Sequence, residues 1–241
     1  MILVTGSNER YQRRVKPYLD TLVQYADFDC YHVGVGYTPE LHGTVKPLTL
    51  TREQNAGAPP ETECIQHGSF LRVLPEGEQG QVVMYTDGDF TMQRGLNADE
   101  RLFLKLTHAQ VAVGYNGGES ETLLTEYGRL SPKKNAKEMD ELWGEDWFTK
   151  PIYNVGCVAM TRGTWDYVHR TYMKNWQLAG DCFVHQARQQ WLLSYIFADL
   201  DVKILPWSLH AHGHFGLKPG MEWRDGQIYH DGKLALFRHY L

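Results

Sequence analysis

The sequence predicts an α/β protein with a mixed, mostly parallel sheet flanked by helices. The chain opens with an apolar run over residues 2–5, an amphipathic helix that reaches about Val23, and a second apolar run over 29–35. This β-α-β order indicates parallel strands joined by a right-handed crossover. Further apolar runs of strand length alternate with stretches of helical periodicity. These runs lie at 82–85, 111–115 and 152–160 of the 241-residue chain.

The turn after the first strand, Thr5-Gly6-Ser7, lies where strand ends and helix N-termini commonly bind phosphate groups or sugar hydroxyls. A dinucleotide fingerprint needs three glycines here and the turn supplies only Gly6, so nicotinamide binding is not predicted. Tyr11 follows in the helix. Its ring is placed either to stack on a base or to pack in the core with the apolar stripe of the helix.

The most informative stretch is the buried strand Val82–Tyr85, which leads into Asp87-Gly88-Asp89. Side chains alternate along an extended chain, so Asp87 and Asp89 point to the same side. Two carboxylates on one side suit a hard cation such as Mn²⁺ or Mg²⁺. Gly88 leaves room for a phosphate to approach the backbone. The alternative is an ordinary Asp-Gly turn after a strand.

Two long segments lack regular periodicity. Residues 36–63 are rich in Pro, Gly, Thr and Glu and predict an irregular loop. Residues 116–146 are polar and form either a surface excursion or a recognition insert. Aromatic side chains near the end of this second segment either offer a platform for a sugar or anchor the segment to the core. They are Trp143, Trp147 and Phe148.

The remaining elements follow from local signals. A short helix over 69–74 carries Arg72, and a capping-box pattern at Asn97 predicts a helix start. The strand over 152–160 contains Gly156, and an interior glycine marks a bulge or a close approach by a ligand. Thr161 caps the helix that comes next. A helix over 181–197, a strand over 202–205 and a last strand over 234–240 complete the chain.

Composition excludes several classes of protein. The formal net charge is −5 without a basic stripe, so a nucleic-acid partner is not expected. No apolar run has the length of a membrane span, and the N-terminal residues lack the features of a secretory signal. The four cysteines are scattered without a C-x-x-C pair, which indicates reduced thiols in a cytoplasmic protein.

Four segments, in this order, resemble the GT-A glycosyltransferases, especially glycosyltransferase family 8, the type of glycogenin and bacterial galactosyltransferases. The order and spacing of the segments carry the resemblance, which spans residues 2–240. The segments are Leu71–Pro75 with Val82–Asp89, then Tyr153–Val158, then Gln189–Ser194 with Val202–Pro206, and finally the C-terminal strand that ends in His239-Tyr240.

The resemblance implies one GT-A-like domain over 1–241, with a nucleotide-binding half over 1–115 and an acceptor-binding half over 116–241. The second half includes the C-terminal strand that completes the metal site. The metal ion, Mn²⁺ or Mg²⁺, would be held by Asp87, Asp89 and His239. His214 and His212 are the alternative third ligands. They belong to the alternating run His210-Ala211-His212-Gly213-His214, which by itself is a weak signal for zinc.

The implied donor is a nucleotide sugar, UDP-glucose or UDP-galactose, and the acceptor is a carbohydrate or another hydroxyl compound. The implied donor-binding residues are Thr5, Gly6, Ser7, Tyr11, Arg72, Asp87 and Gly88. Arg72 is alternatively an exposed helix residue without a role in binding.

The implied catalytic residues are Asn154, Gln189 and Gln190. Gln189 stands where the family has an acid, and Ser194 stands where it has an asparagine. Glutamines are poor nucleophiles, so a same-face displacement with retention is the hypothesis for the transfer. If Asp181 served as a base, inversion would be expected instead. Two other functions stay open from the residues alone: a sugar-phosphate nucleotidyltransferase, and a sugar-binding protein without catalytic activity.

Overall fold

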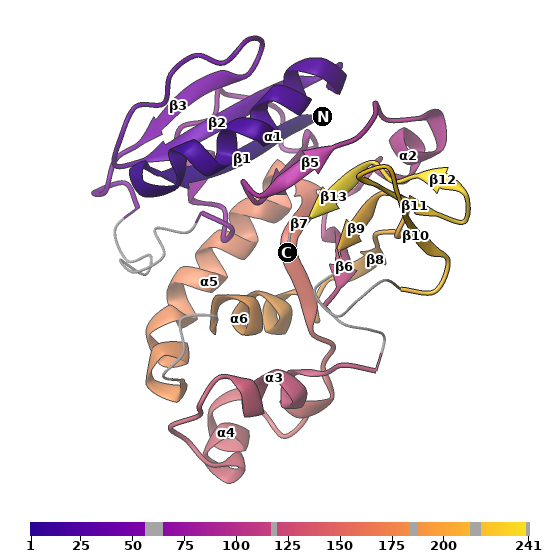
Figure 1. The fold of residues 1–241 in the computed structure, drawn as a ribbon. Helices are drawn as coiled ribbons and strands as arrows, with labels where there is room; N and C mark the ends of the chain where they lie inside the picture. The colour runs from indigo at the N-terminus through magenta and orange to yellow at the C-terminus, as the bar shows by residue number, and fades with distance from the viewer. Residues whose placement is uncertain (56–64, 117–119, 184–187, 213–217, 240–241) are drawn as a thin grey trace.

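The computed structural model describes residues 1–55, 65–116, 120–183, 188–212 and 218–239. Its centre is a seven-stranded sheet in which every neighbouring pair is parallel except the two pairs made by β7 (Figure 1). The predicted mixed, mostly parallel sheet is therefore confirmed. The strands lie in the order β3 (Lys46–Leu50), β2 (Asp29–Val35), β1 (Ile2–Asn8), β4 (Val82–Thr86), β7 (Tyr153–Thr161), β6 (Gln110–Tyr115) and β8 (Asp201–Ile204).

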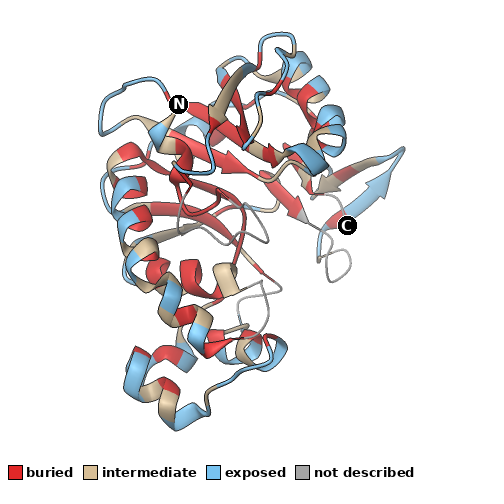
Figure 2. Ribbon diagram, turned by 90° about the vertical axis from the view of Figure 1, so that its left-hand side faces the viewer, coloured by how far each residue is buried: buried red, intermediate tan, exposed pale blue. Residues whose placement is uncertain are grey.

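Helices flank this sheet, and the buried residues form a hydrophobic core on each of its faces (Figure 2). Along β1, Leu3 belongs to one core while Ile2 and Val4 belong to the other, as the period of two in a strand requires. The α-helices are α1 (Gln12–Tyr25), α2 (Ala98–Phe103), α3 (Leu123–Arg129), α4 (Ala136–Trp143), α5 (Arg162–Cys182) and α6 (Arg188–Phe197). None of the helices in the described ranges is both long and apolar enough to cross a bilayer.

The local signals for helix starts are confirmed. Asn97 caps α2 in a capping box, and the Thr161 side chain accepts a hydrogen bond from the backbone of Thr164 at the start of α5. The apolar stripe of α1 is also confirmed, since it buries Val15, Tyr18, Leu19 and Leu22. Tyr11, which fitted the same stripe, lies instead in the short 3₁₀ helix η1 (Glu9–Tyr11) with 41% of its surface exposed.

The expectation of an irregular loop over 36–63 is wrong for part of that segment. Residues Lys46–Leu50 form β3, which pairs in parallel with β2 at the edge of the sheet. Pro47 lowers the strand signal because proline has no backbone N–H to donate. An edge strand tolerates this loss, since only one side of it pairs. Residues 56–64 lie outside the described part of the chain.

Two boundaries near the C-terminus also differ from the prediction. The helix expected over 181–197 is divided, because α5 continues to Cys182 and α6 begins at Arg188. The strand expected over 234–240 is divided between two small sheets. One contains β10 (Met221–Arg224), β11 (Gln227–His230) and β12 (Lys233–Leu234); the other contains β5 (Phe90–Met92), β13 (Phe237–His239) and β9 (His210–His212). Between β12 and β13 the backbone N–H of Leu236 donates to the carbonyl of Ser208, 2.8 Å away, which directs the chain toward β9.

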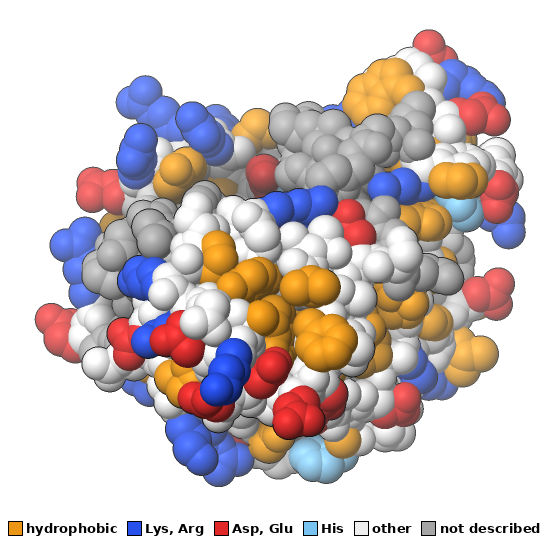
Figure 3. Space-filling model, turned by 90° about the horizontal axis from the view of Figure 1, so that it is seen from below, with side chains coloured by type: hydrophobic (Ala, Val, Ile, Leu, Met, Phe, Trp, Pro, Cys, Tyr) orange, Lys and Arg blue, Asp and Glu red, His pale blue; other side chains and the backbone are white. Residues whose placement is uncertain are grey.

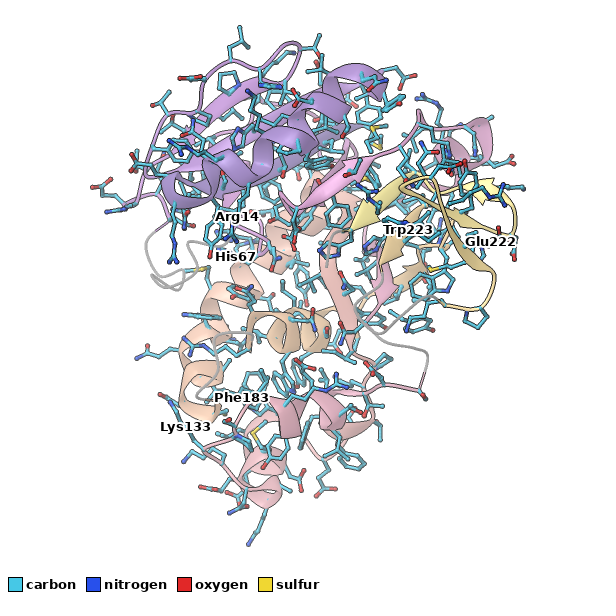
Figure 4. The ribbon with its side chains drawn as sticks, viewed as in Figure 1. Arg14, His67, Lys133, Phe183, Glu222 and Trp223 are labelled. Carbon is cyan, nitrogen blue, oxygen red and sulfur yellow. The ribbon has the colours of Figure 1, made fainter. Side chains whose placement is uncertain are left out.

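The polar segment 116–146 contains α3 and α4, with η3 (Trp147–Thr149) directly after it. Of the two alternatives for the aromatic side chains, the anchor holds for Trp143 and Trp147, which are buried, whereas Phe148 is 41% exposed. Lys133 fixes the segment to the end of α5 by donating from Nζ to the Gly180 carbonyl at 2.9 Å; Figure 4 shows it close to Phe183. Seen from below in Figure 3, the molecule presents both acidic and basic side chains around a group of hydrophobic ones.

Candidate active site

The Asp87-Gly88-Asp89 segment connects the end of β4 with the start of β5. The backbone N–H of Asp87 donates to the carbonyl of Gly156 in β7, 2.8 Å away, so the antiparallel neighbour holds the first aspartate in place. Gly88 packs so tightly that a Cβ atom on it would lie 2.2 Å from Cγ2 of Val15 in α1. A residue other than glycine at position 88 would push α1 and this segment apart.

His239 reaches this segment through strand pairing. In the antiparallel pair of β13 with β5, His239 lies opposite Phe90, the residue that follows Asp89. The imidazole stacks on the Phe90 ring at 4.3 Å between centroids, and its Nε2 lies 3.3 Å from Oδ1 of Asp89. The pairing of two short strands therefore brings a residue from the end of the chain beside the two aspartates.

The three side chains offer ligand atoms that all lie within 4.8 Å of one another. Two carboxylates and one imidazole suit a hard divalent cation such as Mn²⁺ or Mg²⁺. Of the two alternative ligands, His214 lies outside the described residues, and for His212 only the backbone, paired with His239, is described.

Gly156 provides the space for this group. A Cβ at that position would lie 2.9 Å from Oδ2 of Asp87 and 3.0 Å from Cε1 of His239. The pairing of β6 with β7 shifts register between Val113 and Gly114, opposite the stretch that contains Gly156. The irregularity agrees with the predicted bulge at the interior glycine, and the Asp87 and His239 side chains, not a ligand, pack closely against Gly156.

The electrostatics of Asp87 also favour a cation. Burial first, and the charge of Asp89 second, raise the pKa of Asp87 to about 6, against the opposing influence of His239, Gln66 and Tyr85. Gln66 Nε2 and the Tyr85 hydroxyl both donate to Oδ1 of Asp87, at 2.6 and 2.8 Å. The other oxygen, Oδ2, faces His239 across Gly156. A cation bound between the carboxylates would oppose both effects, because its positive charge favours the ionised form of Asp87.

Two cavities meet at these aspartates. The larger, of about 520 Å³, is lined by the three candidate metal ligands and by polar side chains, most of them carboxamides. Its lining includes Gln66, Asn116, Glu126, Arg129, Asn154, Gln189 and Gln190. The smaller, of about 290 Å³, opens beside the β1–η1 connection, where Gly6, Ser7, Asn8, Tyr11, Arg14 and Gly88 line it. Asp87, Asp89 and Gln189 line both cavities.

Most of the sequence-predicted residues lie around these cavities, but three do not. Thr5 is fully buried, and Arg72 donates from Nη1 to the Gln54 carbonyl at 2.6 Å; neither residue lines the two cavities. Asp181 lines a separate cavity with Arg188 and Trp176, so the structure gives no support to its role as a base.

Sequence analysis missed Arg14, Gln66, Glu126 and Arg129. Arg14 follows Tyr11 by three residues, a spacing that places both on one side of a helical turn, and this signal was present in the sequence. Its guanidinium lies 5.2 Å from the centre of the Tyr11 ring, and Figure 4 shows it below α1. The other three residues follow no pattern that points to a site, because loops and an insert bring them to the cavity.

Behind the smaller cavity, Ser7 belongs to a buried polar group. Its Oγ lies 2.9 Å from Nε2 of His32 and 2.5 Å from the hydroxyl of Tyr37. Burial, and to a lesser extent the charge of His42, lowers the pKa of His32 to about 4, so this imidazole is neutral at neutral pH. A neutral ring can orient the Ser7 hydroxyl without adding charge to the cavity.

The shifted pKa of His32 predicts acid sensitivity. The unfolded chain, in which histidine titrates near 6.5, binds a proton more readily than the folded chain as pH falls from about 6.5 to 4, so stability decreases across this window. Between pH 7 and pH 5 we expect His32 to account for a loss of about 2 kcal/mol in the free energy of unfolding. Urea denaturation of wild type and His32→Gln at both values checks this, with His108→Gln at an exposed position as the matched control. Equal pH dependence in wild type and His32→Gln would contradict the assignment.

Comparison with solved structures identifies the fold. The galactosyltransferase LgtC, in complex with donor and acceptor sugar analogues, superposes with a TM-score of 0.62 at 11% identity, covering 100% of this chain and 87% of that one. The chain has the GT-A fold. Mouse xyloside xylosyltransferase 1, in its apo form, gives a TM-score of 0.52 at 11% identity over 100% and 98% of the two chains. The glycosyltransferase GlyE of Streptococcus pneumoniae TIGR4 gives 0.60 at 10% identity, with 55% of that chain covered. No family model and no curated protein sequence matches the chain.

Proposed function

We propose that this GT-A protein is a metal-dependent glycosyltransferase. It moves a hexose from a nucleotide diphosphate sugar, a UDP-sugar such as UDP-glucose or UDP-galactose, to a hydroxyl group of a carbohydrate or another acceptor. One observation carries the proposal: Asp87, Asp89 and His239 converge where two cavities meet. A nucleotide in the smaller cavity and a sugar in the larger would place the diphosphate between them, beside the carboxylates.

Asp87, Asp89 and His239 would hold the divalent ion. When bound, Mn²⁺ or Mg²⁺ supplies Lewis-acid stabilisation of the negative charge that develops on the departing diphosphate. Gln66 and Tyr85 orient the Asp87 carboxylate toward this position through their hydrogen bonds to Oδ1. Gly88 keeps the backbone of the segment close to α1, without a side chain that would obstruct a phosphate.

The smaller cavity has the features of a nucleotide site. The Tyr11 ring, 41% exposed, offers a face on which a base can stack. Arg14 supplies positive charge at the same cavity, whereas Arg72, the arginine that the resemblance implied for donor binding, does not line it. The Ser7 hydroxyl, oriented by His32, adds a hydrogen-bonding group beside Gly6.

The larger cavity has the features of a sugar site. Carboxamides both donate and accept hydrogen bonds, as sugar hydroxyls do, and Asn154, Gln189 and Gln190 all line it. Among the described residues, the enclosed Oε1 of Gln189 has no hydrogen-bond partner, and a sugar hydroxyl would supply one. Glutamines are poor nucleophiles, so a double displacement through these side chains is not expected, and the proposed route to retention is a same-face displacement of the diphosphate by the acceptor hydroxyl.

A thermal-shift experiment tests the donor and the metal together. A UDP-hexose present with Mn²⁺ at about 100 times its Kd should raise the Tm by roughly 5–10 °C, since a ligand bound only by the folded state stabilises it by mass action. EDTA should abolish most of the shift, and ADP-glucose is the matched control for the base. If no uridine or guanosine sugar shifts the Tm with Mn²⁺ present, the proposal fails.

Activity assays distinguish the proposed function from the two other candidate functions. Release of pyrophosphate from a nucleoside triphosphate and a sugar phosphate would identify a nucleotidyltransferase. Binding of a UDP-hexose without transfer to any acceptor, and without slow hydrolysis to UDP and free sugar, would identify a sugar-binding protein. The proposed function instead predicts UDP release from a UDP-sugar that depends on Mn²⁺.

A further inference from the structure

The larger cavity has a second polar wall that the proposed chemistry does not use. Glu126 and Arg129 line it from α3, which belongs to the segment between β6 and β7, whereas the candidate metal ligands come from the β4–β5 connection and β13. In Figure 1, α3 lies at a distance from β13, below the large sheet. We call Glu126 and Arg129 the α3 wall.

Glu126 is unusual in its environment. Only 6% of its surface is exposed, although glutamate is among the residues that are least often buried. The carboxylate lies 3.4 Å from Nη1 of Arg129, and Nη2 of the same arginine lies 3.4 Å from Oε1 of Glu121. Asn116 Nδ2 donates to the other oxygen of Glu121, also at 3.4 Å. The Arg129 guanidinium therefore lies between the Glu121 carboxylate and the buried Glu126 carboxylate that lines the cavity.

The charge of this group restricts what can bind to it. One arginine between two glutamates leaves a formal charge of −1, and both contacts are longer than those of a tight bidentate pair. An anionic group that sought Arg129 would have to compete with Glu121 and Glu126. A neutral sugar would not meet this repulsion, and a carboxylate can accept hydrogen bonds from two adjacent hydroxyls at once.

The position of the α3 wall distinguishes acceptor from donor. A sugar attached to a nucleotide enters the larger cavity at the residues common to both cavities, which are Asp87, Asp89 and Gln189. Glu126 and Arg129 line the larger cavity alone. They are thus placed to contact a second sugar that approaches from the side of α3, beyond the donor.

We propose that Glu126 and Arg129 form an acceptor subsite that selects a neutral sugar with adjacent hydroxyls and disfavours an acidic sugar. The inference rests on the proposed glycosyltransferase activity and gives a role to the segment between β6 and β7. Glu126 accepts from two hydroxyls of the acceptor, and Arg129 donates to a third while it orients the glutamate.

Steady-state kinetics of wild type and Glu126→Gln, with the preferred UDP-sugar and Mn²⁺, test the subsite. The acceptors are methyl hexosides and the corresponding methyl uronosides, which differ by one carboxylate. Loss of a charged hydrogen bond should raise the KM for the best methyl hexoside by about 10- to 100-fold, with kcat changed less than threefold. The preference for hexoside over uronoside, as a ratio of kcat/KM, should fall at least tenfold in the same variant.

The ratio of kcat/KM for hexoside over uronoside keeps the test valid if Glu126→Gln folds poorly. A ratio measured within one preparation does not depend on the fraction of active protein. Arg129→Gln, at a more exposed position, should also raise the hexoside KM, and Glu141→Gln on the exposed side of α4 is the matched control. A fall in kcat with unchanged KM would make Glu126 a base instead of a binding residue and overturn the proposal.

The outcomes separate this inference from the function on which it rests. If wild type neither hydrolyses nor transfers any UDP-sugar, the glycosyltransferase proposal itself fails. If wild type releases UDP from the donor but transfers to no methyl hexoside, or prefers the uronosides, only the acceptor subsite is wrong. Unchanged KM and unchanged acceptor preference in Glu126→Gln would also reject the subsite alone.

Discussion

Replacing Asp89 with alanine is expected to lower the metal-dependent transfer rate at least about a thousandfold, because a Lewis-acid contribution of roughly 4 kcal/mol to the transition state would be lost. Asp89 is exposed, so we expect the change to leave the fold intact. The change removes the carboxylate oxygen that lies 3.3 Å from Nε2 of His239. The measurement is UDP release from the UDP-sugar over a Mn²⁺ titration, together with the Tm shift caused by Mn²⁺ alone.

Asp166→Ala is a suitable control for this substitution. Asp166 lies on the exposed side of α5, where it pairs with Arg170 at 2.9 Å, so the change removes a carboxylate of the same kind without touching either cavity. This variant should keep the wild-type response to Mn²⁺. Full activity of Asp89→Ala, equal with and without Mn²⁺, would show that the carboxylate pair is not a metal site.

Replacing Gly156 with alanine should also lower the transfer activity, although no charged group is removed. The new methyl would lie 2.9 Å from Oδ2 of Asp87, 3.0 Å from Cε1 of His239 and 3.1 Å from Oδ1 of Asn154, so at least two of these side chains must move. A displacement of about 1 Å in a catalytic group commonly costs on the order of a hundredfold in rate. The contacts require shifts of a few tenths of an ångström, so we expect a fall of roughly tenfold in kcat/KM and a weaker Tm shift with Mn²⁺.

The matched control for Gly156→Ala is Gly80→Ala, since a Cβ at position 80 would meet nothing within 4 Å. Circular dichroism should show the same secondary structure in both variants and in wild type. If Gly156→Ala binds Mn²⁺ and turns over as wild type does, then Asp87 and His239 do not have to stay in the positions that the structure gives them.

Much of the central sheet could be predicted because its signals are local. The strand over Asp29–Val35 was predicted with its observed bounds, and those of β4 and β6 were predicted to within one residue. Apolar runs, capping residues and the stripe on α1 act over a few positions, so they are visible without any knowledge of the neighbouring strands. The signal failed at β3, where an edge position tolerates Pro47 and the strand pattern is weak.

The centre of the candidate site could be inferred without the structure. The sequence placed Asp87 and Asp89 at one site after a buried strand, and their ligand atoms do converge, although Gly88 and Asp89 form a turn where an extended segment was expected. Gly6 and Ser7 were expected in a turn after the first strand; β1 instead continues to Asn8, and both residues line the smaller cavity from within this strand. Each of these inferences needs only the geometry of one strand and the turn after it.

The distant residues that join this centre could be identified only from the folded chain. His239 lies beside Asp89 because β13 pairs with β5 in one particular register, and a shift by one residue would turn the imidazole to the opposite face. Arg14, Gln66 and Glu126 reach the cavities from a helix, a loop and an insert, while Arg72 lies outside them. Strand pairing and helix packing join residues that no local pattern connects, because register and packing depend on contacts between segments far apart in the chain.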